Sequence, residues 1–66
     1  MKNNIKELRK GNNLRQEDLA QILGVTRQTI IAIENNKYDP TLELAMKISE
    51  YFGNSVNEIF HLDHES

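Results

Sequence analysis

Three consecutive polar residues, Arg27, Gln28 and Thr29, stand where a helical pattern begins. A guanidinium donates two parallel hydrogen bonds, and a carboxamide both donates and accepts, so each group can pair with the edge of a DNA base. Side chains at the exposed start of a helix meet base edges when that helix lies in a major groove. The chemistry that these residues indicate is the reading of double-stranded DNA.

The residues around this triplet predict two short helices joined by a tight turn. Apolar residues recur at helical spacing over residues 16–23 and again over residues 27–35. Between them, Gly24 can adopt the left-handed conformation that ends a helix, and Thr26 can cap the next helix by accepting hydrogen bonds from its free amides. The segment 16–35 is therefore predicted to be a helix-turn-helix.

Three further helices complete the predicted fold, which is all-α with five helices in a single domain spanning residues 1–66. The first runs from Asn3 or Asn4 to Lys10, the fourth follows a Thr41 cap, and the last opens at Ser55 and contains Val56, Ile59 and Phe60. Residues 35–40 are rich in turn formers and predict a loop. Residues 61–66 are polar and acidic, and are expected to form a frayed tail.

The charge is divided unevenly along the chain. Residues 1–37 hold seven Lys and Arg against four Asp and Glu, whereas residues 38–66 hold one Lys against six acids, giving local charges of +3 and −5 within a net charge of −2. A basic front and an acidic back suit a protein that faces a polyanion on one side only.

The composition disfavours several other kinds of site. No nucleophile with a base, pair of catalytic acids or phosphate-cradling loop is apparent, so we expect no enzyme, no cofactor and no small-molecule substrate. His61 and His64, with Asp63 and Glu65, do not supply the ligands of a metal site, because cysteine is absent and three ligands at fixed geometry cannot be named. Without cysteine or a membrane or secretory segment, the chain is expected to be cytoplasmic with no membrane partner.

Several motifs, in order and at fixed spacing, resemble those of the lambda-repressor-like (Xre type) helix-turn-helix regulators. They cover about residues 5 to 60 and read QEDLA from Gln16, LGVTRQTI from Leu23, IEN from Ile33 and YDPTLELA from Tyr38. The last motif further resembles a subgroup of small, stand-alone, dimeric bacterial regulators that includes the repressor of a cytolysin operon. The resemblance implies a five-helix DNA-binding domain and also allows a short pair of terminal β-strands.

The resemblance also implies roles for individual residues. Base reading is expected of Arg27 and Gln28, with Ile31 and Ala32 placed to touch thymine methyl groups. Phosphate contacts are expected at the start of the second helix, at both ends of the third helix and in the following loop, from Arg15, Gln16, Thr26, Thr29, Asn35 and Lys37. Arg9 and Glu34 match a pair that forms an internal salt bridge in some relatives.

The C-terminal part of the sequence holds more apolar residues than one side of a small helical bundle requires. We expect some of them, Val56, Ile59, Phe60 and Leu62, to form a twofold dimer interface. A dimer suits DNA recognition, because two related helices can read both halves of a palindrome about 34 Å apart.

The favoured function is therefore that of a homodimeric repressor of transcription that binds a palindromic operator. Two alternatives remain open at this point. One is an antitoxin that neutralises a toxin protein and regulates its own promoter. The other is a protein-interaction module that has lost DNA binding, a hypothesis supported by the acidic isoelectric point of about 5.6.

Overall fold

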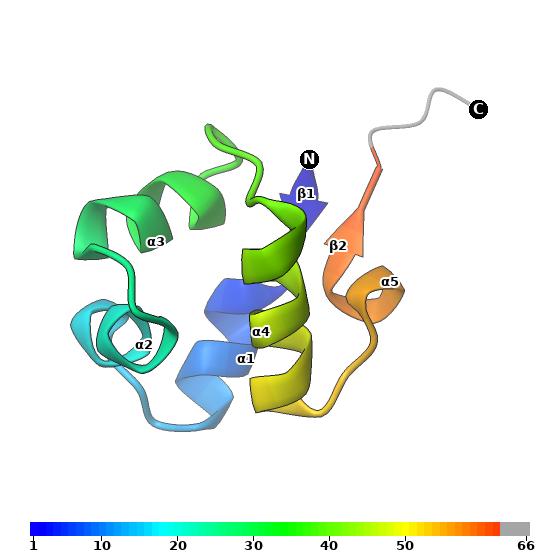
Figure 1. Cartoon of the computed structure of the whole chain (residues 1–66). Coiled ribbons are helices and arrows are strands. Elements are labelled where there is room, and N and C mark those ends of the chain that lie inside the picture. The colour runs from blue at the N-terminus through cyan, green and yellow to red at the C-terminus, as the bar shows by residue number, and fades with distance from the viewer. Residues whose placement is uncertain (63–66) are drawn as a thin grey trace.

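A computed structural model describes residues 1–62 of the chain. Figure 1 shows five helices and two short strands in the order β1 (Lys2–Asn3), α1 (Ile5–Gly11), α2 (Gln16–Leu23), α3 (Arg27–Glu34), α4 (Leu42–Phe52), α5 (Val56–Ile59) and β2 (Phe60–His61). The prediction of five helices with a helix-turn-helix at the second and third is confirmed. The residues Asp63, His64 and Glu65 considered above for a metal lie outside the described residues.

The junction between α2 and α3 follows from two local features of the sequence. Gly24 ends α2 with φ at 75°, and the Val25 amide donates to the Ala20 carbonyl oxygen over 2.9 Å. The hydroxyl of Thr26 then accepts a hydrogen bond of 3.2 Å from the Thr29 amide at the start of α3. Both predicted caps are thus confirmed, and together they fix the turn that sets α3 across α2.

The start of α2 is stabilised differently, because Arg15 stands at the position where a capping hydroxyl is common. A guanidinium cannot accept a hydrogen bond, so the Arg15 side chain cannot cap the helix amides. Instead, the Asp18 carboxylate accepts a hydrogen bond of 2.8 Å from the Arg15 amide. This contact leaves the Arg15 guanidinium at the surface, where 76% of the side chain is exposed.

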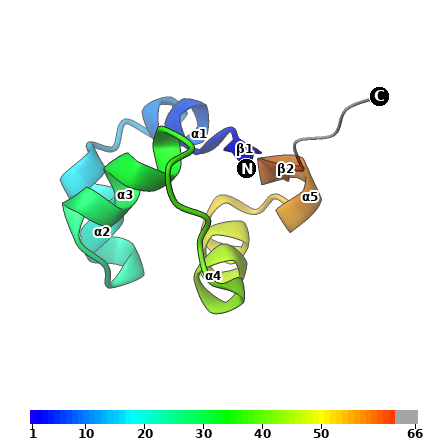
Figure 2. The same cartoon turned by 90° about the horizontal axis from the view of Figure 1, so that it is seen from above.

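The hydrophobic core is formed by one face of every helix and by the second strand. Figure 2 shows α2 and α3 at one end of the molecule and α5, β1 and β2 at the other, with α4 between them. The buried apolar residues are Ile5, Leu19, Ala20, Leu23, Ile30, Ile33, Leu44, Ala45, Ile48, Ile59 and Phe60. The buried side of α3, formed by Ile30 and Ile33, therefore anchors this helix to the core and leaves its other side exposed.

The two ends of the described chain form the short pair of β-strands that the family resemblance allows, but the placement of two residues by periodicity was wrong. Phe60 is not helical and His61 does not belong to a frayed tail, because both lie in β2, where Phe60 pairs with Asn3 and His61 with Lys2. The Asn4 amide adds a hydrogen bond of 2.9 Å to the Ile59 carbonyl oxygen. This pairing satisfies backbone groups that a frayed tail would expose to water.

The first strand also anchors the far end of α3. The Asn3 carboxamide donates to the Ile33 carbonyl oxygen over 2.8 Å and to the Asn36 side-chain oxygen over 3.4 Å. Asn36 adopts φ of 60°, a left-handed conformation that asparagine tolerates better than most residues. The start of α3 is thus fixed locally by its cap, and its end is held by the hydrogen bond from β1.

A buried polar network joins α1, α2 and α3. The Arg9 guanidinium pairs with the Glu34 carboxylate through Nε to Oε2 at 2.7 Å and Nη2 to Oε1 at 3.2 Å, with the two side chains only 8% and 3% exposed. Arg9 also donates to the Leu14 carbonyl oxygen over 2.9 Å, and the Gln16 carboxamide donates to Glu34 Oε1 over 3.1 Å. The salt bridge implied by the family resemblance is confirmed.

Replacing Glu34 with Ala is expected to destabilise the fold strongly. The change leaves the Arg9 guanidinium buried without its counter-charge, and breaking a buried ion pair in this way costs about 3 to 5 kcal/mol. Urea denaturation followed by circular dichroism measures the free energy of unfolding. Glu43, whose side chain is 82% exposed and 3.8 Å from Lys47, provides the matched control, and its replacement with Ala should cost less than about 1 kcal/mol. Equal losses for the two variants would contradict a stabilising role for the buried pair.

Replacing Gly24 with Ala is expected to lower the free energy of unfolding by about 1 to 2 kcal/mol, because an L side chain is strained at positive φ. A Cβ at this position meets no atom within 4 Å, so the cost is conformational rather than steric. Gly11 is equally open but lies in α1 without a positive φ. Gly11→Ala should therefore be neutral or slightly stabilising, and thermal unfolding of the two variants compares them directly. A Gly24→Ala variant as stable as the wild type would show that the turn does not depend on glycine.

Candidate nucleic-acid interface

The exposed face of α3 carries the residues predicted to read bases. Gln28 is exposed, Ile31 and Ala32 are half-buried, and Asn35 is exposed at the end of the helix. Their spacing places them on one face, opposite the buried Ile30 and Ile33. This face is accessible to a partner and combines a carboxamide with apolar groups. In the major groove, a carboxamide can pair with the edge of adenine, and apolar groups can contact the methyl group of thymine.

Arg27 lies beside this face rather than at its centre. It is exposed at the first position of α3 and lines a shallow groove with residues of α1 and of the start of α2. The structure therefore brings Arg27 close to two of the predicted phosphate-contacting residues, Arg15 and Gln16. Sequence spacing alone did not show this grouping, because Arg15 and Arg27 are separated by the whole of α2.

Gln16 is held in one orientation by the buried network. The side chain is half-buried, and one of its two amide hydrogens is directed to Glu34 Oε1. A carboxamide nitrogen carries a second hydrogen, which remains for another acceptor. The contact with Glu34 thus fixes the position of Gln16 at the start of α2 without using all of its donors.

The two threonines predicted to contact phosphate are engaged with each other. Thr26 Oγ1 and Thr29 Oγ1 lie 3.0 Å apart, in addition to the hydrogen bond from the Thr29 amide. Thr26 is exposed, whereas Thr29 is half-buried. Their first role in the structure is to cap α3, so a phosphate would have to share hydroxyl groups that already have a partner.

Asn35 and Lys37 lie at the opposite end of α3 from Thr26 and Thr29. Both side chains are exposed, and the Lys37 amide donates to the Ala32 carbonyl oxygen over 2.9 Å, which closes the end of the helix. An eight-residue helix is about 12 Å long. Thr26 and Thr29 therefore flank the base-reading face at one end of α3, and Asn35 and Lys37 flank it at the other.

The predicted dimer interface requires a correction. Ile59 and Phe60 are 0% and 7% exposed because they belong to the core of the single chain, and Val56 packs partly against that core. Of the four residues, only Leu62 is largely exposed, at 67%. Burial within the chain thus removes Ile59 and Phe60 from the surface that a second copy could cover.

Two exposed apolar residues on α4 were not anticipated from the sequence. Leu42 and Met46 are 74% and 55% exposed and lie one helical turn apart. The sequence predicts one apolar stripe on this helix, formed by Leu42, Leu44, Ala45, Ile48 and Phe52. Leu44, Ala45 and Ile48 are buried as expected. The inclusion of Leu42 was wrong, because this residue lies on another side of the helix from those three.

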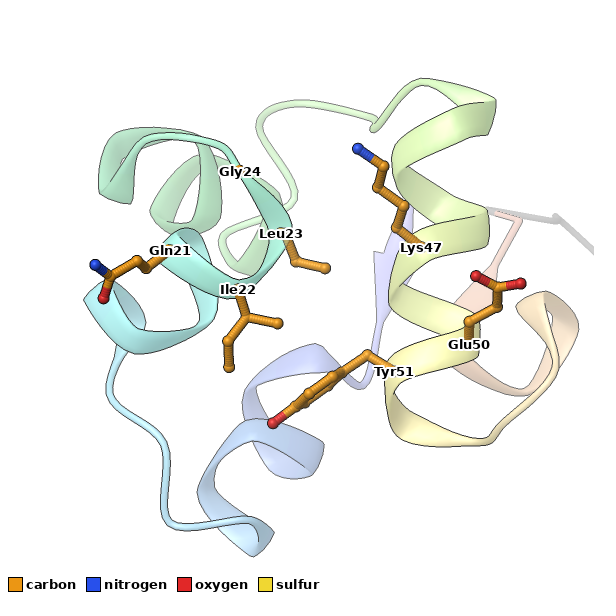
Figure 3. Close-up of a pocket in the computed structure, with 7 residues that line it drawn as sticks. All are labelled: Gln21, Ile22, Leu23, Gly24, Lys47, Glu50 and Tyr51. Carbon is orange, nitrogen blue, oxygen red and sulfur yellow. The ribbon is translucent and has the colours of Figure 1, made fainter.

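A hollow of about 480 Å³ lies between the end of α2 and α4, away from the predicted DNA-contacting residues. Figure 3 shows Ile22 and Tyr51 extending into this space, whereas Gln21 points away from it. The lining combines Lys47 with Glu50, so its charges balance and it is not suited to a polyanion.

Within residues 1–62, no cluster of three or more potential metal ligands is present. No helix in the described part of the chain has the length and hydropathy needed to cross a membrane.

Comparisons with known proteins agree with this architecture. The helix-turn-helix family matches residues 5–59. An uncharacterised HTH-type transcriptional regulator of Methanocaldococcus jannaschii is 60% identical over 60 residues, which cover 91% of each chain. Other relatives from archaea and from Bacillus subtilis have the same designation, so the comparisons do not distinguish a bacterial from an archaeal source.

Two more distant relatives differ in the direction of regulation. The cryptic phage CTXphi transcriptional repressor RstR of Vibrio cholerae is 33% identical over 55 residues, covering 83% of this chain and 50% of the repressor. The transcriptional activator BcrR of Enterococcus faecalis is 38% identical over 55 residues, covering 83% of this chain and 27% of the activator. None of these names describes an enzyme, in agreement with the prediction that the chain is not one. The family match and these identities show that the chain belongs to the lambda-repressor-like (Xre type) helix-turn-helix family.

Proposed function

We propose that the chain binds double-stranded DNA of defined sequence and regulates transcription, as a homodimer that represses by occupying a palindromic operator. The observation that carries this proposal is the exposed edge of α3. Arg27 and Gln28 stand free of ion pairs and side-chain hydrogen bonds within the described residues, at the end of a helix whose other face is buried. A rigid helix with free donors at its start can pair with base edges.

The distribution of charge supports a polyanionic partner for this side of the molecule. Six of the eight Lys and Arg residues lie in β1, α1, α2 and α3 or at their caps, whereas α4 carries one lysine and two glutamates. The overall charge of −2 does not oppose DNA binding, because the acidic residues gather mainly in the second half of the chain. The local field near α3 attracts phosphate.

The exposed apolar residues support a second copy of the chain as a partner. Leu42 and Met46 lie on the side of α4 roughly opposite Lys47 and Tyr51, which face α2. Figure 2 shows that α5 and β2 lie on the other side of α4 from α2. The proposed twofold contact covers Leu42 and Met46 together with Leu62, which is exposed, and the exposed part of Val56.

Repression is the simplest outcome for such a dimer. A protein that occupies both halves of an operator within a promoter excludes polymerase without any further contact. The named phage repressor among the relatives supports this direction, and the named activator gives the alternative that must be tested.

Selection of bound duplexes from a random DNA pool is expected to enrich a palindrome with half-sites about 34 Å apart.

Replacing Gln28 with Ala should then weaken binding to the enriched sequence by about 1 to 3 kcal/mol, with a smaller loss on random DNA, because one bidentate base contact is removed. Fluorescence anisotropy with labelled duplexes measures both affinities.

Gln21→Ala is the matched control, since Gln21 is an exposed glutamine on α2 that is not among the predicted DNA-contacting residues. It should leave both affinities unchanged. A pool without enrichment would contradict sequence-specific binding, and equal losses on the two DNAs would rule out base reading by Gln28. The enriched sequence placed before a reporter gene should lower expression when the protein is supplied, whereas a rise would show activation.

Replacing Leu42 and Met46 together with Glu is expected to shift the protein from dimer to monomer, because two charges would be buried in the proposed contact. Sedimentation equilibrium distinguishes the 7.7 kDa chain from a species of twice that mass. Ile22→Glu is the control, as Ile22 is 46% exposed on the α2 side of α4. A wild-type protein that sediments as a monomer, or a double variant that remains dimeric, would contradict this interface.

A further inference from the structure

The groove beside Arg27 extends well beyond the helix-turn-helix. It has a volume of about 400 Å³ and is lined by Lys6, Arg9, Lys10, Arg15, Gln16, Glu17 and Arg27. Every one of these side chains is polar or charged, and five of the seven are cationic. Such a lining excludes an apolar ligand and suits an extended anion.

Most of the positive charge in the groove is not neutralised by the protein. Within residues 1–62, Lys6, Lys10 and Arg27 have no carboxylate within 4.0 Å. Arg15 lies 3.9 Å from Glu17 and 3.5 Å from Asp18, but its side chain is 76% exposed, so water screens both contacts. The groove therefore presents three unpaired cations and a fourth that is only weakly paired.

The base of this groove is rigid. Arg9, which contributes to the lining, is 7% exposed and is held by Glu34 and by the Leu14 carbonyl oxygen. Its charge is already balanced by Glu34, so it supports the groove rather than adding to its net charge. Lys6 and Lys10 flank Arg9 on α1, one turn apart, with their side chains exposed.

We propose that this groove is a second DNA contact, in which Lys6 and Lys10 of α1 hold the sugar-phosphate backbone just outside the base pairs that α3 reads. This inference rests on the proposed function. The groove adjoins Arg27 at the start of α3, so a strand whose bases meet Gln28 would continue along it. Its volume of about 400 Å³ leaves room for more than a single phosphate group.

The lysines are suited to this role because an ammonium group binds phosphate as a point charge without requiring a defined base. Contacts of this kind carry no sequence information, but each releases counterions and steepens the dependence of binding on salt. Lys6 and Lys10 should thus add affinity and fix the position of the duplex without altering which sequence is preferred.

The test measures binding of the full chain to the enriched duplex and to random duplex over a range of salt concentrations. For Lys6→Ala with Lys10→Ala, the slope of log affinity against log salt should fall by about 0.9 for each phosphate that the variant no longer neutralises. The affinities for both DNAs should fall by the same factor. Lys6→Arg with Lys10→Arg should restore the slope. Lys47→Ala, an exposed helical lysine outside the groove, should leave it unchanged.

The two proposals fail in different ways. If the unsubstituted protein binds no DNA, the proposed function fails and this inference fails with it. If the unsubstituted protein binds DNA but the double alanine variant keeps its slope, the groove is not a DNA contact, although the proposed function stands. A lower affinity for the enriched sequence alone would also overturn the inference, because it would indicate base reading. Circular dichroism of each variant confirms that it is folded.

Discussion

The ion pair between Arg9 and Glu34 is the interaction on which the rest of the structure depends. It joins α1 to the end of α3 within the protein interior, and Gln16 extends it to the start of α2. In water such a pair contributes little, but inside the fold each charge requires the other. The pair therefore links the three helices that carry the candidate interface into one unit.

The surface above this network divides into parts with different chemistry. The exposed face of α3 offers a carboxamide and apolar groups for base edges, and the regions around it offer cations and donors for phosphate. Rigid support is supplied from below by the core and from the far end by Asn3, which bonds to the last turn of α3. Apart from Arg27, the charged side chains thus lie where the phosphate backbone, rather than the base sequence, would be contacted.

Local chemistry explains what the sequence could predict. The caps at Gly24 and Thr26 depend on neighbouring residues only, and both were found as expected. The strand at Phe60–His61 could not be derived from spacing, since two residues show no periodicity and their partner lies near the opposite end of the chain. The burial of Ile59 could not be predicted either, because the apolar character of a residue does not show whether it lies in the core or at an interface. The groove at Lys6 likewise required the spatial arrangement of α1 against α2 and α3.

If DNA lies across α3 and the adjoining groove, its binding should change the chemical shifts of the backbone amides in both regions. Amide chemical shifts of the isotope-labelled protein, recorded as an enriched duplex is added, report on every such position at once. We expect the largest changes at residues 15–17, 26–32 and 35–37, with smaller ones near Lys6 and Lys10, and little change at the hollow between α2 and α4. If the largest chemical-shift changes instead occurred around Ile22 and Tyr51, that result would contradict binding across α3.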